Sequence, residues 1–141
     1  MNANPYAQYR DVQVQTASPA RLVVMLYDGA IRFANTAKRG IETGDAKLTH
    51  EGMTRTQAIL DHLTSTLNPD AGDIARNLGR LYEFMGRRLL EASLHRDPRA
   101  VDDVTGLLES LRTAYAQIDS AAPRPGAVPL ATPAQAVSNL G

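Results

Sequence analysis

The feature that most constrains the fold is a set of four long segments in which apolar residues recur three and four positions apart. The segments span about 18–43, 45–67, 73–95 and 97–118. None of them alternates apolar and polar residues over the length of a strand. Because the segments have similar lengths and short connections, neighbouring helices should run antiparallel. We therefore predict an all-α fold, an antiparallel up-down-up-down four-helix bundle.

Local signals mark where these helices begin and end. Ser18 followed by Pro19 is a helix start, since a serine hydroxyl accepts from a free backbone N–H and proline at the first position loses no hydrogen bond. The pair Asp97-Pro98 repeats this pattern before the fourth helix. Gly44 should end the first helix, and Asn68-Pro69 should break the chain after the second.

The chain of 141 residues is long enough for one domain with a core. We expect an irregular N-terminal arm over 1–16 and the bundle over 17–120. Residues 121–141 contain four prolines among many alanines and almost no charge. Such a composition cannot form a helix or a sheet interior, so we expect a flexible, disordered C-terminal tail.

Composition excludes several function classes. Lysine and arginine total 15, as do aspartate and glutamate, which argues against a nucleic-acid partner or a polybasic membrane anchor. The longest apolar run, Leu22 to Tyr27, is far shorter than the roughly 20 residues that span a bilayer. The N-terminus has no apolar core of a secretory signal. We therefore expect a cytoplasmic protein without membrane insertion.

The sequence offers no constellation for chemistry. It has no cysteine and no Glu-x-x-His pair of the kind that holds two metal ions in a bundle. It also has no glycine-rich phosphate loop and no nucleophile elbow. We expect no catalytic residue, metal or cofactor, and binding is the favoured class. Two alternatives stay open: a histidine phosphotransfer bundle using His62, which the neighbouring Asp61 would oppose, and a self-associating structural bundle.

The first helix carries more apolar surface than a bundle helix needs, because it has two apolar arcs where one would suffice. The first arc consists of Leu22, Met25, Leu26, Gly29, Phe33 and Ala37. The second consists of Val23, Tyr27, Ala30, Ile31 and Ala34. Either the N-terminal arm covers the extra arc, or a partner helix binds there in a groove.

An unusual triplet, Tyr27-Asp28-Gly29, lies in the middle of this helix. A glycine inside a helix costs up to about 1 kcal/mol relative to alanine, and close approach of another helix or of the arm could offset that cost. A partly buried Asp28 would need a hydrogen bond, for instance from arm backbone N–H groups or a tyrosine hydroxyl.

The residues around the first helix closely resemble the flagellar secretion chaperone FliS family. The resemblance rests on the block from Val14 to Pro19 and on Met25 to Ile31, which reads MLYDGAI. Asn4-Pro5-Tyr6 with Tyr9 fits the same pattern, and weaker matches continue to Asp97-Pro98.

The resemblance implies a cytoplasmic bundle that binds the C-terminal segment of flagellin. Such a chaperone prevents premature polymerisation and helps deliver flagellin to a component of the flagellar type III export apparatus. The arm with Tyr6 and Tyr9 would lie near the binding surface and cover it when empty. The predicted partner-binding residues are Tyr6, Tyr9, Val14, Leu22, Val23, Leu26, Tyr27, Asp28, Ala30, Ile31 and Ala34. The oligomeric state, monomer or weak dimer, is left open.

Overall fold

The computed structural model describes residues 17–121, and all of its long elements are α-helices. The elements are α2 (Pro19–Thr43), α3 (Ala46–Ser65), the short 3-10 helix η1 (Pro69–Ala71), α4 (Asp73–His95) and α5 (Pro98–Ala121). This part of the chain contains no strand, so the predicted all-α four-helix fold is confirmed. The expected arm over 1–16 and nearly all of the expected tail lie outside the described residues.

The helix ends follow the local signals. The Ser18 hydroxyl accepts from the backbone N–H of Arg21 at 3.0 Å, and Gly44 ends α2 in the left-handed conformation with φ 71°. A carboxylate oxygen of Asp97 accepts from the backbone N–H of Arg99 at 3.0 Å. Two ends differ by a few residues, because α3 ends at Ser65 rather than near 67 and α5 runs to Ala121 rather than to about 118.

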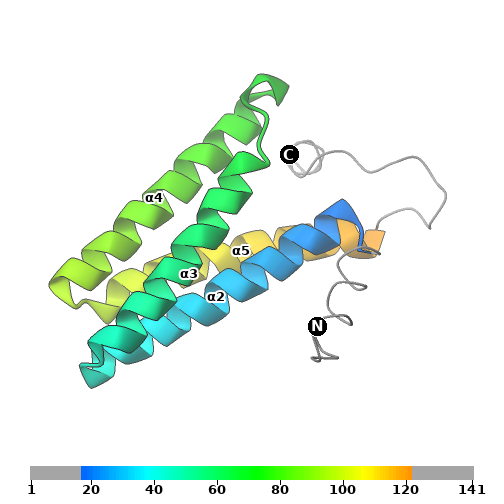
Figure 1. Ribbon diagram of the computed structural model, residues 1–141. Helices are drawn as coiled ribbons and strands as arrows, with labels where there is room; N and C mark the ends of the chain where they lie inside the picture. Colours follow the sequence, from blue (N-terminus) through cyan, green and yellow to red (C-terminus); the bar gives the residue numbers. More distant parts are fainter. Residues whose placement is uncertain (1–16, 122–141) are drawn as a thin grey trace, which may run out of the picture.

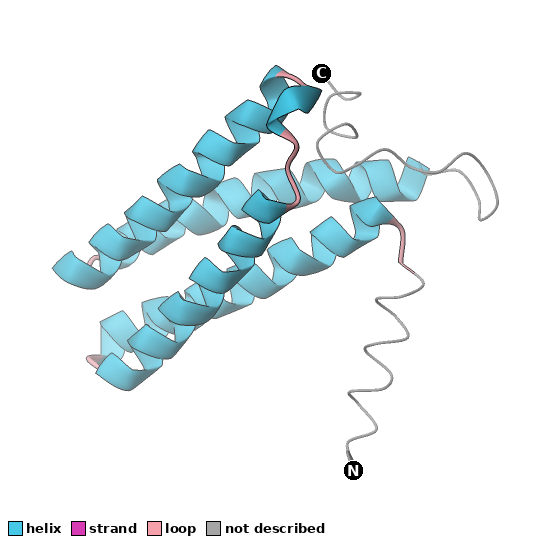
Figure 2. Ribbon diagram, turned by 45° about the horizontal axis from the view of Figure 1, so that its top comes forward, coloured by secondary structure: helices cyan, strands magenta, loops and turns pink. Residues whose placement is uncertain are grey.

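The helices form a ring in which α2 packs against α3 and α5, and α4 packs against the same two helices. Figure 1 shows all four close together where α2 ends and α3 begins. The pair α3 and α4 then diverges from the pair α2 and α5, and the turned view of Figure 2 shows the same arrangement. We call the end where the helices converge the closed end and the other the open end.

Small residues bring α2 and α3 into direct backbone contact at the closed end. A Cβ atom added to Gly52 would lie 2.4 Å from the backbone nitrogen of Ala37. One added to Gly40 would lie 2.5 Å from the backbone nitrogen of Thr49. Both distances are far below a normal van der Waals contact, so only glycine fits at these two positions.

Three tyrosines from different helices meet in the core, namely Tyr27 of α2, Tyr82 of α4 and Tyr115 of α5. The hydroxyls of Tyr27 and Tyr82 hydrogen-bond at 2.6 Å, and the rings of Tyr27 and Tyr115 meet edge to face with centroids 5.6 Å apart. Burial raises the pKa of all three phenols, because the phenolate would lose its hydration. These contacts join α2, α4 and α5 through side chains.

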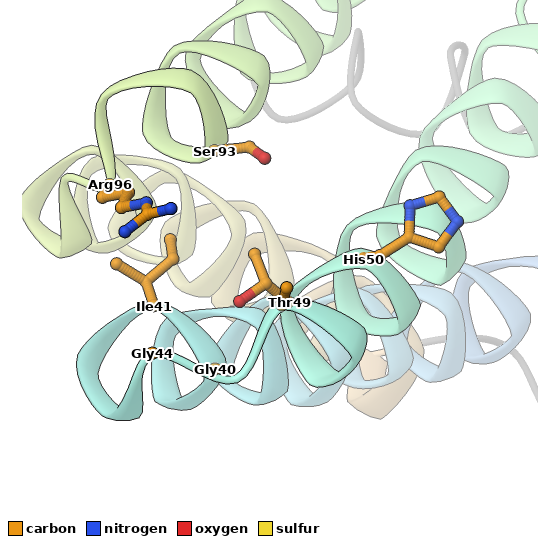
Figure 3. A pocket seen from close by; sticks show the side chains of 8 residues that line it. Gly40, Ile41, Gly44, Thr49, His50, Ser93 and Arg96 are labelled. Carbon is orange, nitrogen blue, oxygen red and sulfur yellow. The ribbon is translucent and has the colours of Figure 1, made fainter.

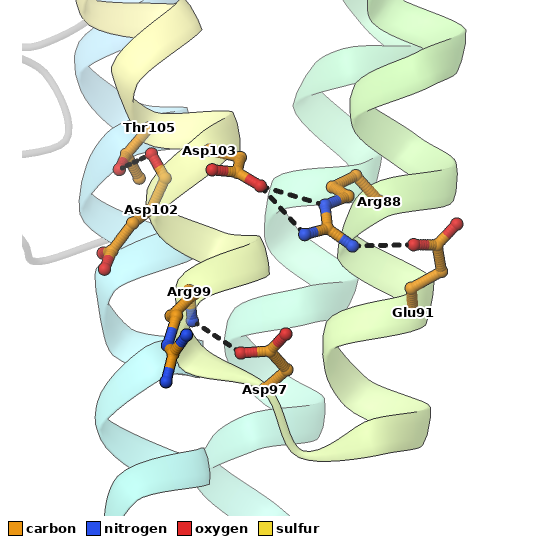
Figure 4. A network of polar contacts seen from close by, with 7 residues as sticks. All are labelled: Arg88, Glu91, Asp97, Arg99, Asp102, Asp103 and Thr105. Carbon is orange, nitrogen blue, oxygen red and sulfur yellow. Dashed lines mark hydrogen bonds and ion pairs between the residues drawn. The ribbon is translucent and has the colours of Figure 1, made fainter.

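Exposed ion pairs connect the helices at the outside of the bundle. Figure 4 shows the Arg88 guanidinium of α4 donating to Asp103 of α5 at 2.9 and 3.1 Å and to Glu91 at 2.8 Å. The hydrogen bond to Asp103 raises the pKa of Arg88. Lys38 of α2 pairs with Asp102 of α5 at 2.8 Å. Because the carboxylates are more than half exposed, these pairs orient the helices more than they stabilise them.

Candidate partner-binding groove

Two of the hollows on the bundle are candidate sites. The first lies at the closed end, where Ser93 and Arg96 at the end of α4 approach the turn between α2 and α3 (Figure 3). Arg96 has a left-handed backbone with φ 51° and caps α4. The hollow has a volume of about 200 Å³ and a lining that is equally polar and apolar. Its size and lining do not suit an apolar helix.

The second hollow is a larger groove between α2 and α3 toward the open end, with a volume of about 490 Å³. We call it the α2–α3 groove. Its apolar lining outweighs its polar lining. The residues that line it are Leu22, Met25, Leu26, Gly29, Arg32 and Phe33 of α2 and Arg55, Ile59 and His62 of α3.

The spacing along α2 explains why these side chains share one face. Leu22, Met25, Leu26, Gly29 and Phe33 follow each other at intervals of three, one, three and four residues, which is the pattern of one helical stripe. At Gly29 a Cβ atom would lie 3.2 Å from the Cδ1 atom of Ile59. The helix that approaches this glycine is therefore α3, and it does so through a side chain.

Two arginine guanidinium groups lie close to the ring of Phe33, in the middle of α2. The guanidinium carbon of Arg32 lies 5.0 Å from the ring centroid and that of Arg55 lies 5.3 Å from it. Both distances are within the range of cation–π attraction. His62 lies further along α3 in the same groove. Among the described residues, no aspartate or glutamate lines the groove, so its polar part is basic.

The structure divides the predicted partner-binding residues into two groups. Leu22 and Leu26 line the groove. By contrast Val23, Tyr27, Ala30 and Ala34 are at most 3% exposed and belong to the core. The second apolar arc thus faces the bundle, and the first arc lines the groove except at Ala37, which is buried against Gly52 at the closed end. The four core side chains present no surface to a partner in this structure.

Asp28 lies toward α5, and neither Asp28 nor Ile31 lines the groove. The guanidinium of Arg112 on α5 donates to the carboxylate of Asp28 through its Nε atom, and this hydrogen bond raises the pKa of Arg112. Among the described residues, the carboxylate of Asp28 therefore binds an arginine 84 residues away in sequence, whereas the expected partners on the arm lie outside the described part of the chain. Ile31, one turn further, is half-buried against the core.

The remaining predicted residues, Tyr6, Tyr9 and Val14, lie outside the described part of the chain. The groove residues that were not predicted as partner-binding are Met25, Gly29, Arg32, Phe33, Arg55, Ile59 and His62. A sequence signal existed for three of them, because Met25, Gly29 and Phe33 belong to the first apolar arc. Ile59 gave a weaker signal, since it stands beside Leu60 and widens the apolar stripe of α3.

The described helices hold no candidate metal cluster and no candidate membrane span. In residues 17–121, no three histidine, aspartate or glutamate side chains gather where they could hold a metal ion. None of the helices in that range is long and apolar enough to cross a bilayer. The open apolar groove between α2 and α3 offers a surface of the kind that can bind an amphipathic helix.

Comparison with known proteins identifies the family. Residues 2–122 match the model of the flagellar protein FliS family, so the chain belongs to that family. It is 39% identical to the flagellar secretion chaperone FliS of Salmonella typhimurium over 80% of this chain and 86% of that protein. It is 33% identical to the chaperone of the same name from Bacillus subtilis, over 81% and 85% of the two chains. The corresponding protein of Vibrio cholerae is 35% identical over 77% and 80%.

Membership of this family settles the broad class of the protein. FliS proteins are flagellar secretion chaperones and not enzymes. The resemblance seen in the sequence is therefore confirmed, and so is the expectation of a protein outside the enzyme classes.

Proposed function

We propose that this protein is a cytoplasmic export chaperone that holds the C-terminal segment of flagellin in the α2–α3 groove. It would prevent premature polymerisation of flagellin and deliver it to a component of the flagellar type III export apparatus. The observation that carries the proposal is an open apolar groove on a member of a flagellar chaperone family.

The groove has the physical properties that such a partner requires. Leu22, Met25 and Phe33 line it without belonging to the core or packing against it, so their apolar surface is available. Each Å² of apolar surface removed from water contributes about 25 cal/mol. That gain must exceed the few kcal/mol needed to order a disordered segment. A helix with apolar residues at intervals of three and four could lie in the groove with its apolar face against this lining.

The N-terminal arm enters the proposal as a removable cover of the groove. Tyr6, Tyr9 and Val14 would contact the apolar lining when no partner is bound. Deletion of residues 1–15 should then raise the binding of a fluorescent dye to exposed apolar surface and change the affinity for flagellin. If neither quantity changes, the arm is a passive extension.

Calorimetric titration with the isolated C-terminal segment of flagellin tests the proposal. We expect stoichiometric binding with a negative heat-capacity change from apolar burial. Met25→Asp should weaken binding strongly, because a carboxylate in the groove would have to be desolvated. Leu94→Asp is the matched control, since Leu94 lies on α4 and is 70% exposed.

Two results would contradict the proposal. The first is an absence of heat and of any shift in sedimentation when both partners are folded and soluble. The second is equal weakening by both substitutions, since the groove would then not be the binding surface. Sedimentation of the chain alone at several concentrations separates this function from a self-associating bundle, which would form dimers through the same groove.

A further inference from the structure

We infer that the α2–α3 groove selects helices whose apolar face is flanked by carboxylates, so that its partner segment is an acidic amphipathic helix. The inference rests on the proposed function, because it concerns the same groove. It adds the chemical class of the partner and names Arg32 and Arg55 as the residues that determine it.

The two arginines come from different helices and converge on one aromatic ring. Arg32 on α2 and Arg55 on α3 both lie within 5.3 Å of the centroid of Phe33. Cation–π contacts with Phe33 hold the two guanidiniums at the groove. Such a contact does not use the guanidinium N–H groups, which can still donate hydrogen bonds to an anion. Two like charges brought to one ring repel each other, and an anion bound between or beside them would relieve that repulsion.

Residues 17–121 supply little negative charge to these arginines. Glu51 lies 3.8 Å from Arg55, but both side chains are more than half exposed and the contact is long. Asp28, one turn before Arg32 on α2, is engaged by Arg112 of α5. Asp61, beside His62, is exposed and does not line the groove. Arg32 has no carboxylate partner among residues 17–121.

The layout of the groove sets what the partner must present. Leu22, Leu26 and Ile59 offer an apolar floor for residues spaced three and four apart. Carboxylates one turn away on the same helix would reach the arginines, whose planar forks bind carboxylates in a bidentate manner. His62 adds a ring N–H donor on the α3 side. A helix flanked by lysines would instead place like charges together.

Three synthetic helical peptides with one identical apolar face test the inference against the full chain. Their flanking positions carry glutamate, glutamine or lysine. We expect the glutamate peptide to bind roughly tenfold more tightly than the lysine peptide at low salt. The reason is that the glutamates attract Arg32 and Arg55, whereas the lysines repel them. The preference should fall severalfold at about 0.5 M salt, where exposed charges are screened.

Charge-neutralising variants locate the effect. In the double variant Arg32→Gln/Arg55→Gln, the glutamate and lysine peptides should bind with affinities within about twofold of each other. The control Arg80→Gln/Arg87→Gln removes the same charge from exposed positions of α4 and should leave the preference intact. Circular dichroism confirms that both variants are folded.

The flagellin C-terminal segment, titrated in parallel, separates the two claims. If that segment binds but the three peptides do not differ, the selection for carboxylates is wrong and the proposed function stands. If the glutamate peptide binds preferentially and flagellin does not bind, the partner class stands and the proposed function is wrong. Failure of all peptides to bind the folded chain, or equal preference in both double variants, also overturns the inference.

Discussion

The two ends of the α2–α3 interface are built from different kinds of contact. At the closed end, Gly40 and Gly52 allow backbone to touch backbone. Toward the open end, Ile59 occupies the space above Gly29 with a flexible side chain, and larger apolar residues line a groove. One pair of helices thus combines a rigid join with an accessible apolar surface. The comparison shows what residue size does along this helix pair. Small residues at the closed end hold the two helices together, and larger apolar residues toward the open end leave a surface that a partner can bind.

The largest effect is expected where the backbones touch. Gly52→Ala should lower the free energy of unfolding by about 3 kcal/mol, because the new Cβ atom would lie 2.4 Å from Ala37 N and 2.7 Å from Phe33 O. Urea denaturation measures the change. Gly106→Ala on α5 is the control, since nothing lies within 4 Å of its Cβ position, and it should be neutral or stabilise by up to about 1 kcal/mol. Equal effects of both substitutions would refute the rigid join.

The core beside the open end depends on a side-chain hydrogen bond. Tyr27→Phe should cost about 2 kcal/mol, because it leaves the buried hydroxyl of Tyr82 without its Tyr27 partner. The double variant Tyr27→Phe/Tyr82→Phe should recover part of this loss, since both polar groups are then gone. Urea denaturation of the two single variants and the double variant measures the losses of unfolding free energy. A loss in the double variant larger than the sum of the two single losses would contradict the hydrogen bond.

The same tyrosines predict a loss of stability in alkali. Their folded-state pKa values are raised above the ordinary value of 10.0, so the folded chain keeps protons that the unfolded chain releases. Their contribution is complete below about pH 10 and is lost as the pH rises further, by up to about 1.4 kcal/mol per pH unit for each group. Urea midpoints at pH 8, 10 and 11 test this. The double variant should show a shallower decline, and an unchanged slope would refute the assignment.

The smallest effect is expected at Gly29. Gly29→Ala should change the free energy of unfolding by less than about 1 kcal/mol, because the helix gains from alanine while Ile59 must shift slightly. Thermal denaturation beside Gly52→Ala makes the comparison direct. A loss as large as that of Gly52→Ala would mean that the two ends of the interface are packed alike.

Sequence predicted the helix ends well because their causes are local. Ser18, Gly44 and Asp97 act on backbone groups within a few residues, and each does so in the structure. The early end of α3 also has a local cause, because the backbone N–H and hydroxyl of Thr66 donate to the carbonyl of Leu63, but the sequence analysis did not use this signal.

Which arc of α2 faces the core could not be predicted from the pattern, because both arcs are apolar. The structure buries Ala30 and Ala34 together with Tyr27, so that small residues admit neighbouring helices and a tyrosine reaches its partner on α4. The pairing of Asp28 with Arg112 could not be predicted either, since the two residues are distant in sequence. The α3 side of the groove was missed for the same reason: it exists only once two helices are placed together.

Methyl NMR of the methionines tests the central claim most directly. The chain has four methionines, of which Met25 lines the groove, while Met53 and Met85 are buried in the core. With selectively labelled methionine methyls and the flagellin C-terminal segment bound, we expect intermolecular NOEs to Met25 and none to Met53 or Met85. A bound complex in which Met25 shows no contact with flagellin would contradict the account.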